Sequence, residues 1–271
     1  FVAEWGLMKI PFTKMHGAAN DFIVVDDRAL TFPLEDQAFI QKITDRRTGV
    51  GSDGVILLQP SEKGDLRMRF INPDGNEVEM CGNGARCFAM LAYTIGAAPA
   101  RMKIETVAGI VYAEVSGDEV CLDLTEPTGL QLDLSLDTEW SMDFVNTGVP
   151  HVIVWVDDVG AVDIPQWGPF FRYHKAFAPQ GTNVNFAQLN ADGSLSIRTY
   201  ERGVEAETMA CGTGAAATGV TAVQRGRASF PVGVHCAGGY DLIIGVDDAR
   251  VTLTGGAEKV FEGEVCYGNR V

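Results

Sequence analysis

The sequence predicts an α+β protein of two pseudo-symmetric domains, each a mostly antiparallel, barrel-like sheet wrapped around a central α-helix. Three observations support this prediction: an internal repeat, many short runs of β-type residues bounded by Gly, Asp and Pro, and one clear helix in each half. The length of 271 residues suits one large or two small domains. Apolar residues make up 46% and charged residues 21% of the chain, which is the balance of a soluble globular protein that can bury a core.

The repeat relates the two halves of the chain at an offset of 130 or 131 residues. Residues 17–27 resemble residues 148–158, and the Cys-Gly-x-Gly-Ala string that begins at Cys81 recurs at Cys211. Two shorter matches keep the same order along the chain. Glycine-rich apolar strings also align by chance, but four ordered matches favour two homologous halves.

The repeat divides the chain into two expected domains. We expect the first to comprise residues 8–125 plus 259–271 and the second to comprise residues 126–258. The crossing between them is expected in residues 126–142, which begin with few β-type residues. Residues 1–7 precede Met8, which resembles a natural start. We therefore expect them to be a cloning remnant or an extension and leave them out of the fold argument.

Runs of β-type residues bounded by turn-forming residues recur in both halves. In the first half they predict strands over Phe22–Asp26, Gly54–Leu58, Leu66–Asn72, Arg101–Thr106 and Ile110–Val115. In the second half they predict strands over Val152–Val156, Thr182–Gln188, Ser194–Tyr200, Asp241–Val246 and Arg250–Thr254. One helix is predicted in each half, after Cys81 as far as a stop at Gly96 and after Cys211 as far as a stop near Gly226.

The charge of the chain excludes several classes of partner. Its formal net charge is −15 and its sequence pI is about 4.6, so it repels phosphate backbones and anionic membranes. The longest mostly apolar stretch, residues 87–100, is too short to cross a bilayer. We expect a cytoplasmic protein that binds neither nucleic acid nor membranes.

The six cysteines carry further information about compartment and metal binding. They contain no Cys-x-x-Cys pair, so a structural zinc site is not expected. The sequence has no secretory signal pattern, and we expect the thiols to be reduced. We interpret Cys87, Cys121, Cys236 and Cys266 as small buried hydrophobic residues.

The strongest chemical signal is a cysteine placed just before each predicted helix. Cys81 and Cys211 both precede a glycine-flanked turn that opens the helix. The free N–H groups of a helix N-terminus carry partial positive charge, which favours thiolate over thiol and attracts a carboxylate. The neighbouring glycines allow that carboxylate to approach the backbone closely.

The symmetry of the two cysteines indicates a two-base reaction. If the halves face each other, a carbon held in the cleft between them would have a thiolate on one side and a thiol on the other. Such a pair removes a proton from one face and returns one to the opposite face, which inverts the configuration. The helix N-termini would stabilise the negative charge that develops. No dinucleotide fingerprint or metal-ligand spacing is visible, so we expect no cofactor and no metal.

Other interpretations of these residues stay open at this point. Cys81 and Cys211 could form a redox dithiol, or an inactive disulfide after oxidation. His151 could be a hydrogen-bonded residue at a strand end, and Asn20 a turn-forming residue. Glu201 and Arg202 could belong to an ordinary solvated turn.

With these motifs in view, the chain resembles the diaminopimelate epimerase family over nearly its whole length. The matching strings are Lys14–Phe22, Arg69–Gly75 leading into Met80–Cys87, Gly181–Val184, Tyr200–Gly203 leading into Ala210–Gly214, and Val260–Gly263. The resemblance implies an isomerase of amino-acid and lysine biosynthesis that works without pyridoxal phosphate. Its substrate would be L,L-diaminopimelate and its product the meso isomer.

The resemblance also implies roles for individual residues. It makes Cys81 and Cys211 the two acid/base residues, with Cys81 taking the proton from the L,L isomer. It makes His151 and Glu201 important for activity. Substrate contacts would come from the backbone at Gly82, Asn83, Gly212 and Thr213 and from the side chains of Asn20, Asn72, Asn183, Glu201 and Arg202. It further implies a homodimer, with Phe261 at a position linked to dimerisation.

Three departures from the family pattern affect these expectations. Val149 stands where many members have Asn, and Gly54 stands where some have Gln, so neither can supply a side-chain hydrogen bond. The loop Gly203–Thr208 is one residue longer than the commonest family form. The alternative within the same fold is a proline racemase or hydroxyproline epimerase. Asn83 argues against it, because those enzymes typically have His there, and so does Arg202, because proline has no distal carboxylate.

Overall fold

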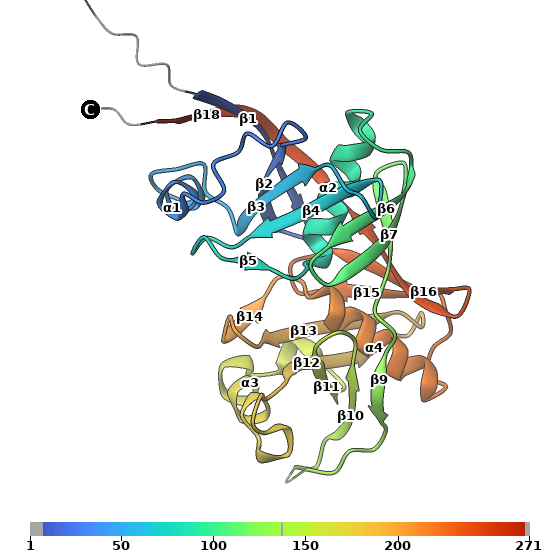
Figure 1. Ribbon diagram of the computed structural model, residues 1–271. Coiled ribbons are helices and arrows are strands. Elements are labelled where there is room, and N and C mark those ends of the chain that lie inside the picture. The colour runs from blue at the N-terminus through green and yellow to red at the C-terminus, as the bar shows by residue number, and fades with distance from the viewer. Residues whose placement is uncertain (1–7, 137, 269–271) are drawn as a thin grey trace, which may run out of the picture. The chain divides into compact units, whose positions relative to one another are not determined.

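The computed structural model describes residues 8–136 and 138–268. The expectation for residues 1–7 therefore lies outside the described residues. The chain forms two compact units (Figure 1). Unit 1 runs as far as residue 120 and takes up the chain again from residue 256, while unit 2 comprises residues 121–255. Residues 126–142 thus belong to unit 2.

Unit 1 is built on one mixed sheet. Its elements are β1 (Met8–Gly17), β2 (Asn20–Asp26), α1 (Gln37–Thr44), β3 (Gly54–Gln59), β4 (Leu66–Ile71), β5 (Glu77–Val78), α2 (Gly82–Thr94), β6 (Arg101–Thr106), β7 (Gly109–Ser116) and β18 (Glu258–Tyr267). The pairing runs β18, β1, β2, β3, β4, β6, β7, with the short β5 also on β4. The pairs β2–β3 and β4–β6 are parallel and the others are antiparallel.

Unit 2 repeats this plan. Its elements are β9 (Thr128–Gln131), β10 (Ser141–Asn146), β11 (Pro150–Trp155), α3 (Ile164–Arg172), β12 (Asn183–Leu189), β13 (Leu195–Glu201), β14 (Ala206–Thr208), α4 (Gly212–Gln224), β15 (Val232–Cys236), β16 (Asp241–Asp247) and β17 (Arg250–Gly256), with two single-turn 3₁₀ helices at Val159–Ala161 and Lys175–Phe177. The strand β8 (Glu119–Asp123) crosses the division between the units. The pairing runs β9, β10, β11, β12, β13, β15, β16, β17, and β11–β12 and β13–β15 are the parallel pairs.

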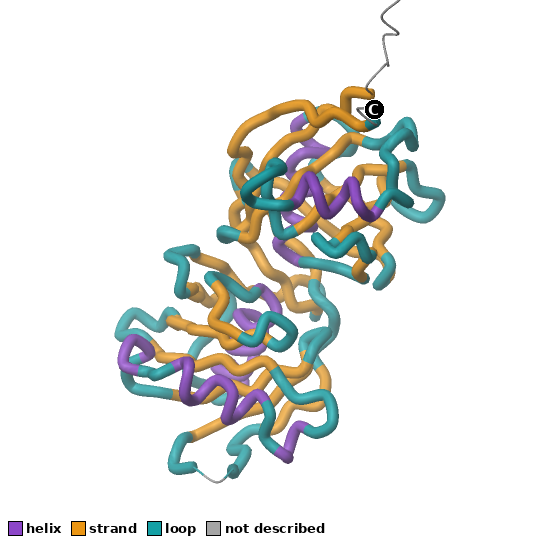
Figure 2. The backbone as a smooth tube through the Cα atoms, turned by 90° about the vertical axis from the view of Figure 1, so that its left-hand side faces the viewer, coloured by secondary structure: helices purple, strands orange, loops and turns teal. Residues whose placement is uncertain are grey.

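The register of the strands confirms the internal repeat. Phe22 lies opposite Gly54 in β2 and β3, and His151 lies opposite Asn183 in β11 and β12. The positions that begin these two parallel pairs are 129 residues apart (151 − 22 and 183 − 54), two fewer than the offset expected for residues 17–27. In both units the central helix follows a short strand: β5, which pairs with β4, precedes α2, and β14, which pairs with β13, precedes α4. The α+β fold expected from the sequence, with few helices among many strands, is therefore correct (Figure 2).

The two central helices are buried on nearly all sides. Helix α2 packs on β1, β2, β3, β4 and β7, and α4 packs on β10, β11, β12, β13, β15 and β16. Residues 83–89 of α2 and residues 214–222 of α4 are buried without interruption, which is typical of a helix surrounded by its sheet. Both helices end as expected, because Gly96 and Gly226 adopt the left-handed conformation at φ +69° and +67°. No helix in the described part of the chain is long and apolar enough to cross a membrane.

Every strand predicted from the sequence is present, but several elements were not predicted. The missing ones include β1, whose Lys and Thr residues hide its β character, and the short helices α1 and α3. The interpretation of four cysteines as buried is correct for Cys87 and Cys236. It is wrong for Cys266, which is exposed on β18, and Cys121 is only half-buried.

A buried ion pair fixes the C-terminal end of α4 in unit 2. The Asp143 carboxylate is fully buried and accepts two hydrogen bonds from the Arg225 guanidinium, both at 2.6 Å. It also accepts a hydrogen bond from the Trp155 indole at 2.7 Å. Arg225 follows the last residue of α4, so this cluster ties the helix end to β10 and β11.

This cluster predicts a large loss of stability for Arg225→Met. The substitution would leave the buried Asp143 carboxylate without its positive partner, which costs about 3–5 kcal/mol. Arg28→Met, which breaks the exposed pair between Arg28 and Asp26, should cost about 1 kcal/mol or less. Urea unfolding followed by tryptophan fluorescence measures both. Equal losses for the two variants would contradict the prediction.

Candidate active site

The first cysteine lies exactly where an extended segment turns into α2. Cys81 is the N-cap residue of α2, and its carbonyl accepts the first helical hydrogen bond from the Ala85 N–H at 2.8 Å. Its side chain does not cap the helix. The N–H groups of the first turn are therefore left to bind an anionic ligand beside the thiol.

The side chain of Asn20 lies beside this thiol. The Cys81 thiol donates to the Asn20 Oδ1 atom at 3.6 Å, and the Asn83 amide donates to the same oxygen at 3.3 Å. The Asn20 Nδ2 group donates to the Asp53 carboxylate at 2.7 Å. Because a carboxylate only accepts, this contact fixes the orientation of the amide and turns Oδ1 toward Cys81.

Three charged residues, Arg46, Asp53 and Arg86, hold Asn20 and Asn83 in place, and the sequence analysis assigns a role to none of them. The second oxygen of Asp53 accepts from Arg46 at 2.6 Å. Arg86, which is fully buried in α2, donates to the Asn83 Oδ1 atom at 2.8 Å. The only sequence signals were the position of Asp53 next to a buried strand and the place of Arg86 in the string that follows Cys81.

The turn that carries Asn20 is strained. Ala18 and Ala19 both have positive φ, at +53° and +63°, in the hairpin between β1 and β2. A left-handed conformation costs a non-glycine residue roughly 1–2 kcal/mol. The hairpin passes so close to α2 that a Cβ on Gly17 would lie 2.9 Å from the Asn83 carbonyl. The strain thus accompanies the close approach of Asn20 to the start of α2.

The second cysteine occupies the equivalent position in unit 2. Cys211 is the N-cap residue of α4, and its carbonyl accepts from the Ala215 N–H at 2.9 Å. Burial, and next the charge of Glu201, raise the pKa of the Cys211 thiol to about 12, although hydrogen bonds from Thr213 and the Gly214 backbone oppose the shift. At Cys211 burial and the Glu201 charge therefore oppose the expected effect of the helix N-terminus, which favours the thiolate.

A buried histidine is linked to this thiol through one hydroxyl. The His151 Nε2 atom lies 3.0 Å from the Thr213 Oγ1 atom, which lies 3.5 Å from the Cys211 sulfur. Burial, reinforced by the charge of Arg202, lowers the pKa of His151 to about 3, so the imidazole is neutral at physiological pH. The His151 Nδ1 atom lies 3.0 Å from the Asn185 amide nitrogen.

Glu201, Arg202 and Asn183 belong to the same cluster in unit 2. Burial raises the pKa of the Glu201 carboxyl. The Asn183 Oδ1 atom accepts from the Arg202 backbone N–H at 2.8 Å, and its Nδ2 group donates to the Pro150 carbonyl at 3.2 Å. Asn183 therefore fixes the backbone at Arg202, at the end of β13.

Each departure from the family pattern has a structural setting. A Cβ on Gly54 would lie 2.4 Å from the Phe70 ring, so the ring occupies the space of a longer side chain there. Val149 contributes only its backbone, whose carbonyl accepts from the Thr147 N–H at 3.2 Å. In the longer loop, Glu205 binds Arg172 at 2.9 Å and the Tyr173 hydroxyl at 2.8 Å, which ties the loop to α3.

The remaining predicted residues lie in unit 1. Asn72 is half-buried in the turn after β4, where its backbone N–H donates to the Asn76 carbonyl at 2.9 Å. Phe261 lies on β18 with 45% of its surface exposed, and its ring packs edge-on against Phe12 at 5.8 Å.

The structure thus groups the predicted residues by unit. Asn20, Cys81, Gly82 and Asn83 come together at the start of α2. His151, Glu201, Arg202, Cys211 and Thr213 come together at the start of α4. In the described part of the chain, no group of three His, Cys, Asp or Glu residues could hold a metal ion.

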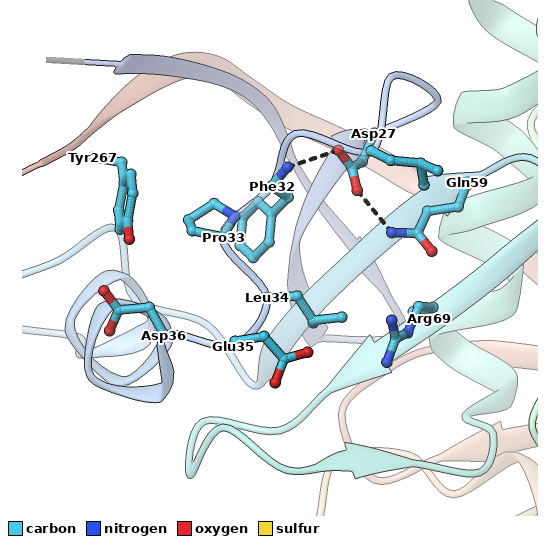
Figure 3. A pocket seen from close by; sticks show the side chains of 10 residues that line it. Asp27, Phe32, Pro33, Leu34, Glu35, Asp36, Gln59, Arg69 and Tyr267 are labelled. Atoms are coloured by element: carbon cyan, nitrogen blue, oxygen red, sulfur yellow. Dashed lines mark hydrogen bonds between the residues drawn. The ribbon is translucent and has the colours of Figure 1, made fainter. Parts of the chain in front are cut away.

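An open pocket in unit 1 lies outside both clusters (Figure 3). It has a volume of about 810 Å³, and its lining includes Phe32, Leu34, Arg69 and Tyr267 but none of the predicted site residues. The Asp27 carboxylate on its wall accepts hydrogen bonds from the Phe32 N–H at 2.9 Å and the Gln59 amide at 2.8 Å. These hydrogen bonds of Asp27 serve the fold, and the pocket contains neither Cys81 nor Cys211.

Comparison with known proteins identifies the family to which the chain belongs. The family model described as diaminopimelate epimerase matches residues 12–129 and 144–260. The diaminopimelate epimerase of Hydrogenobaculum sp. is 41% identical over 271 residues, covering 94% of this chain and 98% of that protein. Those of Aquifex aeolicus and Archaeoglobus fulgidus are 41% and 40% identical and cover 97% and 96% of their own lengths and 94% of this chain.

Solved structures at lower identity show the same fold. A PhzF-family phenazine biosynthesis protein from Bacillus anthracis has a TM-score of 0.72 at 20% identity, covering 96% of this chain and 99% of its own. A hydroxyproline epimerase from Agrobacterium vitis has a TM-score of 0.69 at 19% identity, covering 95% of this chain and 91% of its own.

The close packing at the start of α4 predicts a strong effect for Gly214→Ala. The new Cβ would lie 2.3 Å from the Asn185 Oδ1 atom, so the strand or the helix must move. We expect a loss of about 1–3 kcal/mol in the free energy of unfolding. Gly82→Ala, whose Cβ would meet no atom within 4 Å, should change it by about 0.5 kcal/mol or less. Urea unfolding of both variants measures the difference, and a tolerated Gly214→Ala would refute the packing argument.

Proposed function

Because the chain belongs to the diaminopimelate epimerase family, we propose that it epimerises L,L-diaminopimelate to meso-diaminopimelate with Cys81 and Cys211 as the two acid/base residues. The observation that carries this proposal is that each cysteine is the N-cap residue of a buried helix, so its thiol lies beside the N–H groups of the first helical turn. This places a proton-transfer group directly beside an anion-binding helix end in both units.

The two cysteines can take up and supply every proton that the reaction needs. The thiolate of one cysteine takes the α-proton of the substrate and becomes a thiol. The thiol of the other cysteine then gives its proton to the opposite face of the resulting carbanion and becomes a thiolate. In the L,L direction Cys81 is the base and Cys211 the acid. The raised pKa of the Cys211 thiol supports this order, because the acid must hold its proton until the carbanion forms.

The substrate carboxylate next to the reacting carbon would lie on the helix N-termini. The backbone N–H groups at Gly82, Asn83, Gly212 and Thr213 would hold it and stabilise the charge that develops in the transition state. Gly82 supports this role, because a Cβ built on it would meet no atom within 4 Å, which leaves room for the carboxylate. No metal or organic cofactor takes part in these steps.

The distal amino acid group of the substrate would be recognised by charge. Arg202 would pair with the distal carboxylate, and Glu201 would accept from the ammonium group. Asn20, Asn72 and Asn183 would add amide contacts. His151 is buried and neutral, so we propose that it acts on Cys211 through Thr213 rather than as a charged group on the substrate. The substrate is a small molecule of the cytoplasm.

Proton exchange in deuterated water tests this function. Reduced protein with L,L-diaminopimelate should lose the α-proton NMR signal and form the meso isomer. Cys81→Ala and Cys211→Ala should each slow formation of the meso isomer by roughly a hundredfold or more, because each removes one of the two proton-transfer groups. The exposed Cys266→Ala should keep full activity. Exchange with proline or hydroxyproline alone would favour the racemase alternative.

We further propose that the protein forms a homodimer through β18. Consecutive residues of a strand face opposite sides, and Val260 and Phe261 are 55% and 45% exposed. Residues 258–262, the first half of β18, are all exposed, which is unusual for a strand paired with β1. A second copy of the chain would cover it.

This proposal predicts that Phe261→Glu weakens self-association. A charge on β18 would remain buried and unpaired in the dimer, so the variant should sediment as a monomer at concentrations where the parent protein is a dimer. Val246→Glu, at an exposed apolar position of β16 in unit 2, is the control and should leave the mass unchanged. A monomeric parent protein at all concentrations would exclude the dimer.

A further inference from the structure

The two cysteine sites differ in the residues that lie beneath the helix N-terminus. In unit 1, the position of a Cβ on Gly84 faces the Ile56 side chain at 2.9 Å and the Phe22 ring at 3.5 Å. In unit 2, the position of a Cβ on Gly214 faces the Asn185 Oδ1 atom at 2.3 Å. Counted from the positions that begin the two parallel pairs, Phe22 with Gly54 and His151 with Asn183, Ile56 and Asn185 both lie two residues along their strands, at an offset of 185 − 56 = 129.

The pair His151 and Asn185 therefore replaces the apolar pair Phe22 and Ile56. All four side chains are fully buried. A buried, hydrogen-bonded polar pair offers little stability over a well-packed apolar pair. The fold accepts either pair, so the polar pair of unit 2 has a role other than packing.

The hydrogen bonds around Asn185 fix the orientation of its amide. Its Nδ2 group donates to the Val152 carbonyl at 3.2 Å, and a carbonyl can only accept. Its Oδ1 atom accepts from the Thr199 hydroxyl at 3.0 Å. The nitrogen side of the amide therefore faces the His151 Nδ1 atom at 3.0 Å.

This orientation selects one tautomer of His151. Because Asn185 donates to Nδ1, that nitrogen must carry a lone pair, and the proton of the neutral imidazole must be on Nε2. The Nε2–H group then donates to the Thr213 oxygen at 3.0 Å. The Thr213 hydroxyl proton is thereby directed to the Cys211 sulfur at 3.5 Å.

We propose that Asn185 is a positioning residue that locks His151 as the Nε2–H tautomer, so that Thr213 donates a hydrogen bond to Cys211 and stabilises its thiolate. The chain Asn185, His151, Thr213, Cys211 is called the relay below. No proton is transferred along the relay, which only orients the Thr213 hydroxyl proton toward Cys211. It leaves the S–H bond of Cys211 free for the substrate carbon and stabilises the sulfur once that proton has been given away. This inference deepens the proposed epimerase function and rests on it.

Nitrogen NMR of ¹⁵N-histidine protein tests the first step without substrate. The chain has four histidines, and loss of one signal set in His151→Gln assigns His151. We expect the wild-type protein to show Nε2 protonated and Nδ1 unprotonated. In Asn185→Asp the carboxylate should recruit a proton to Nδ1 and raise the pKa of His151. An Nδ1-protonated His151 in the wild-type protein would overturn the proposal.

Alkylation of Cys211 by iodoacetamide, followed by peptide mass spectrometry, tests the second step. In a Cys81→Ser background, Asn185→Leu and Thr213→Val should each slow alkylation roughly threefold to tenfold between pH 8 and pH 10, because the thiolate loses a donor. The double variant should be no slower than Thr213→Val alone, since both act through one hydroxyl. Thr213→Val should leave the His151 tautomer unchanged, because Asn185 still donates to Nδ1.

Thr221→Val is the matched control for removing a buried hydroxyl from α4. Thr221 is fully buried, and its hydroxyl donates to the Ala217 carbonyl at 3.0 Å, outside the relay. It should change neither the tautomer nor the alkylation rate. Unchanged His151 signals and Cys211 alkylation in folded Asn185 variants would overturn the proposal. If Asn185→Leu does not fold, three measurements still test the proposal. These are the tautomer of His151 in the wild-type protein, the pKa of His151 in Asn185→Asp, and the rate of Cys211 alkylation in Thr213→Val.

The same variants separate this inference from the epimerase function. With the otherwise wild-type protein, Asn185→Leu should slow α-proton exchange of diaminopimelate at least roughly tenfold, with a smaller change in KM, because the residue does not touch the substrate. If the wild-type protein does not exchange this proton, the proposed function fails. The tautomer and alkylation measurements would then still test the relay by themselves.

Discussion

The close approach of a strand to the first turn of each central helix is the constraint on which the rest of the structure depends. A side chain does not fit at Gly84 or Gly214. A Cβ on Gly84 would lie 2.9 Å from the Ile56 side chain, and a Cβ on Gly214 would lie 2.3 Å from the Asn185 Oδ1 atom. This contact fixes how far α2 and α4 reach into their sheets, and it places Cys81 and Cys211 at the point where extended chain becomes helix. The glycines of the repeated motif thus serve packing as well as anion binding.

The sequence predicts the fold well where the physical signal is local. The fully buried β3 stands out as an apolar run, and the glycine stops of α2 and α4 are visible directly. Other elements depend on distant partners. The ammonium group of Lys14 in β1 is buried and donates hydrogen bonds to the Asp21 carboxylate and the Gly51 carbonyl. Because the sequence shows a charged residue at this buried position, the alternation of polar and apolar residues in β1 does not indicate a strand. Helices α1 and α3 have eight and nine residues, too few for a clear period.

The candidate site shows the same division between local and distant information. Cys81, Cys211 and their helix ends follow from the motif alone. Asn185 and Asp53 do not, because their roles depend on His151 and Asn20, which are brought to them by parallel strand pairing and by a strained hairpin. A residue two positions after Asn183 lies on the same face of the strand, and this was the one available signal for Asn185.

In the proposed reaction, near-symmetric halves must still give the two cysteines different properties, because one has to hold a proton while the other lacks one. At Cys81 the neighbouring Asn20 oxygen accepts a hydrogen bond, whereas in the proposed relay Thr213 donates one to Cys211. Burial acts in the opposite direction at Cys211 and raises the pKa of its thiol. At Cys211 burial and the proposed hydrogen bond from Thr213 therefore oppose each other. The proposed two-base reaction needs this balance, since each turnover would exchange the roles of the two cysteines and leave the proton on the other side.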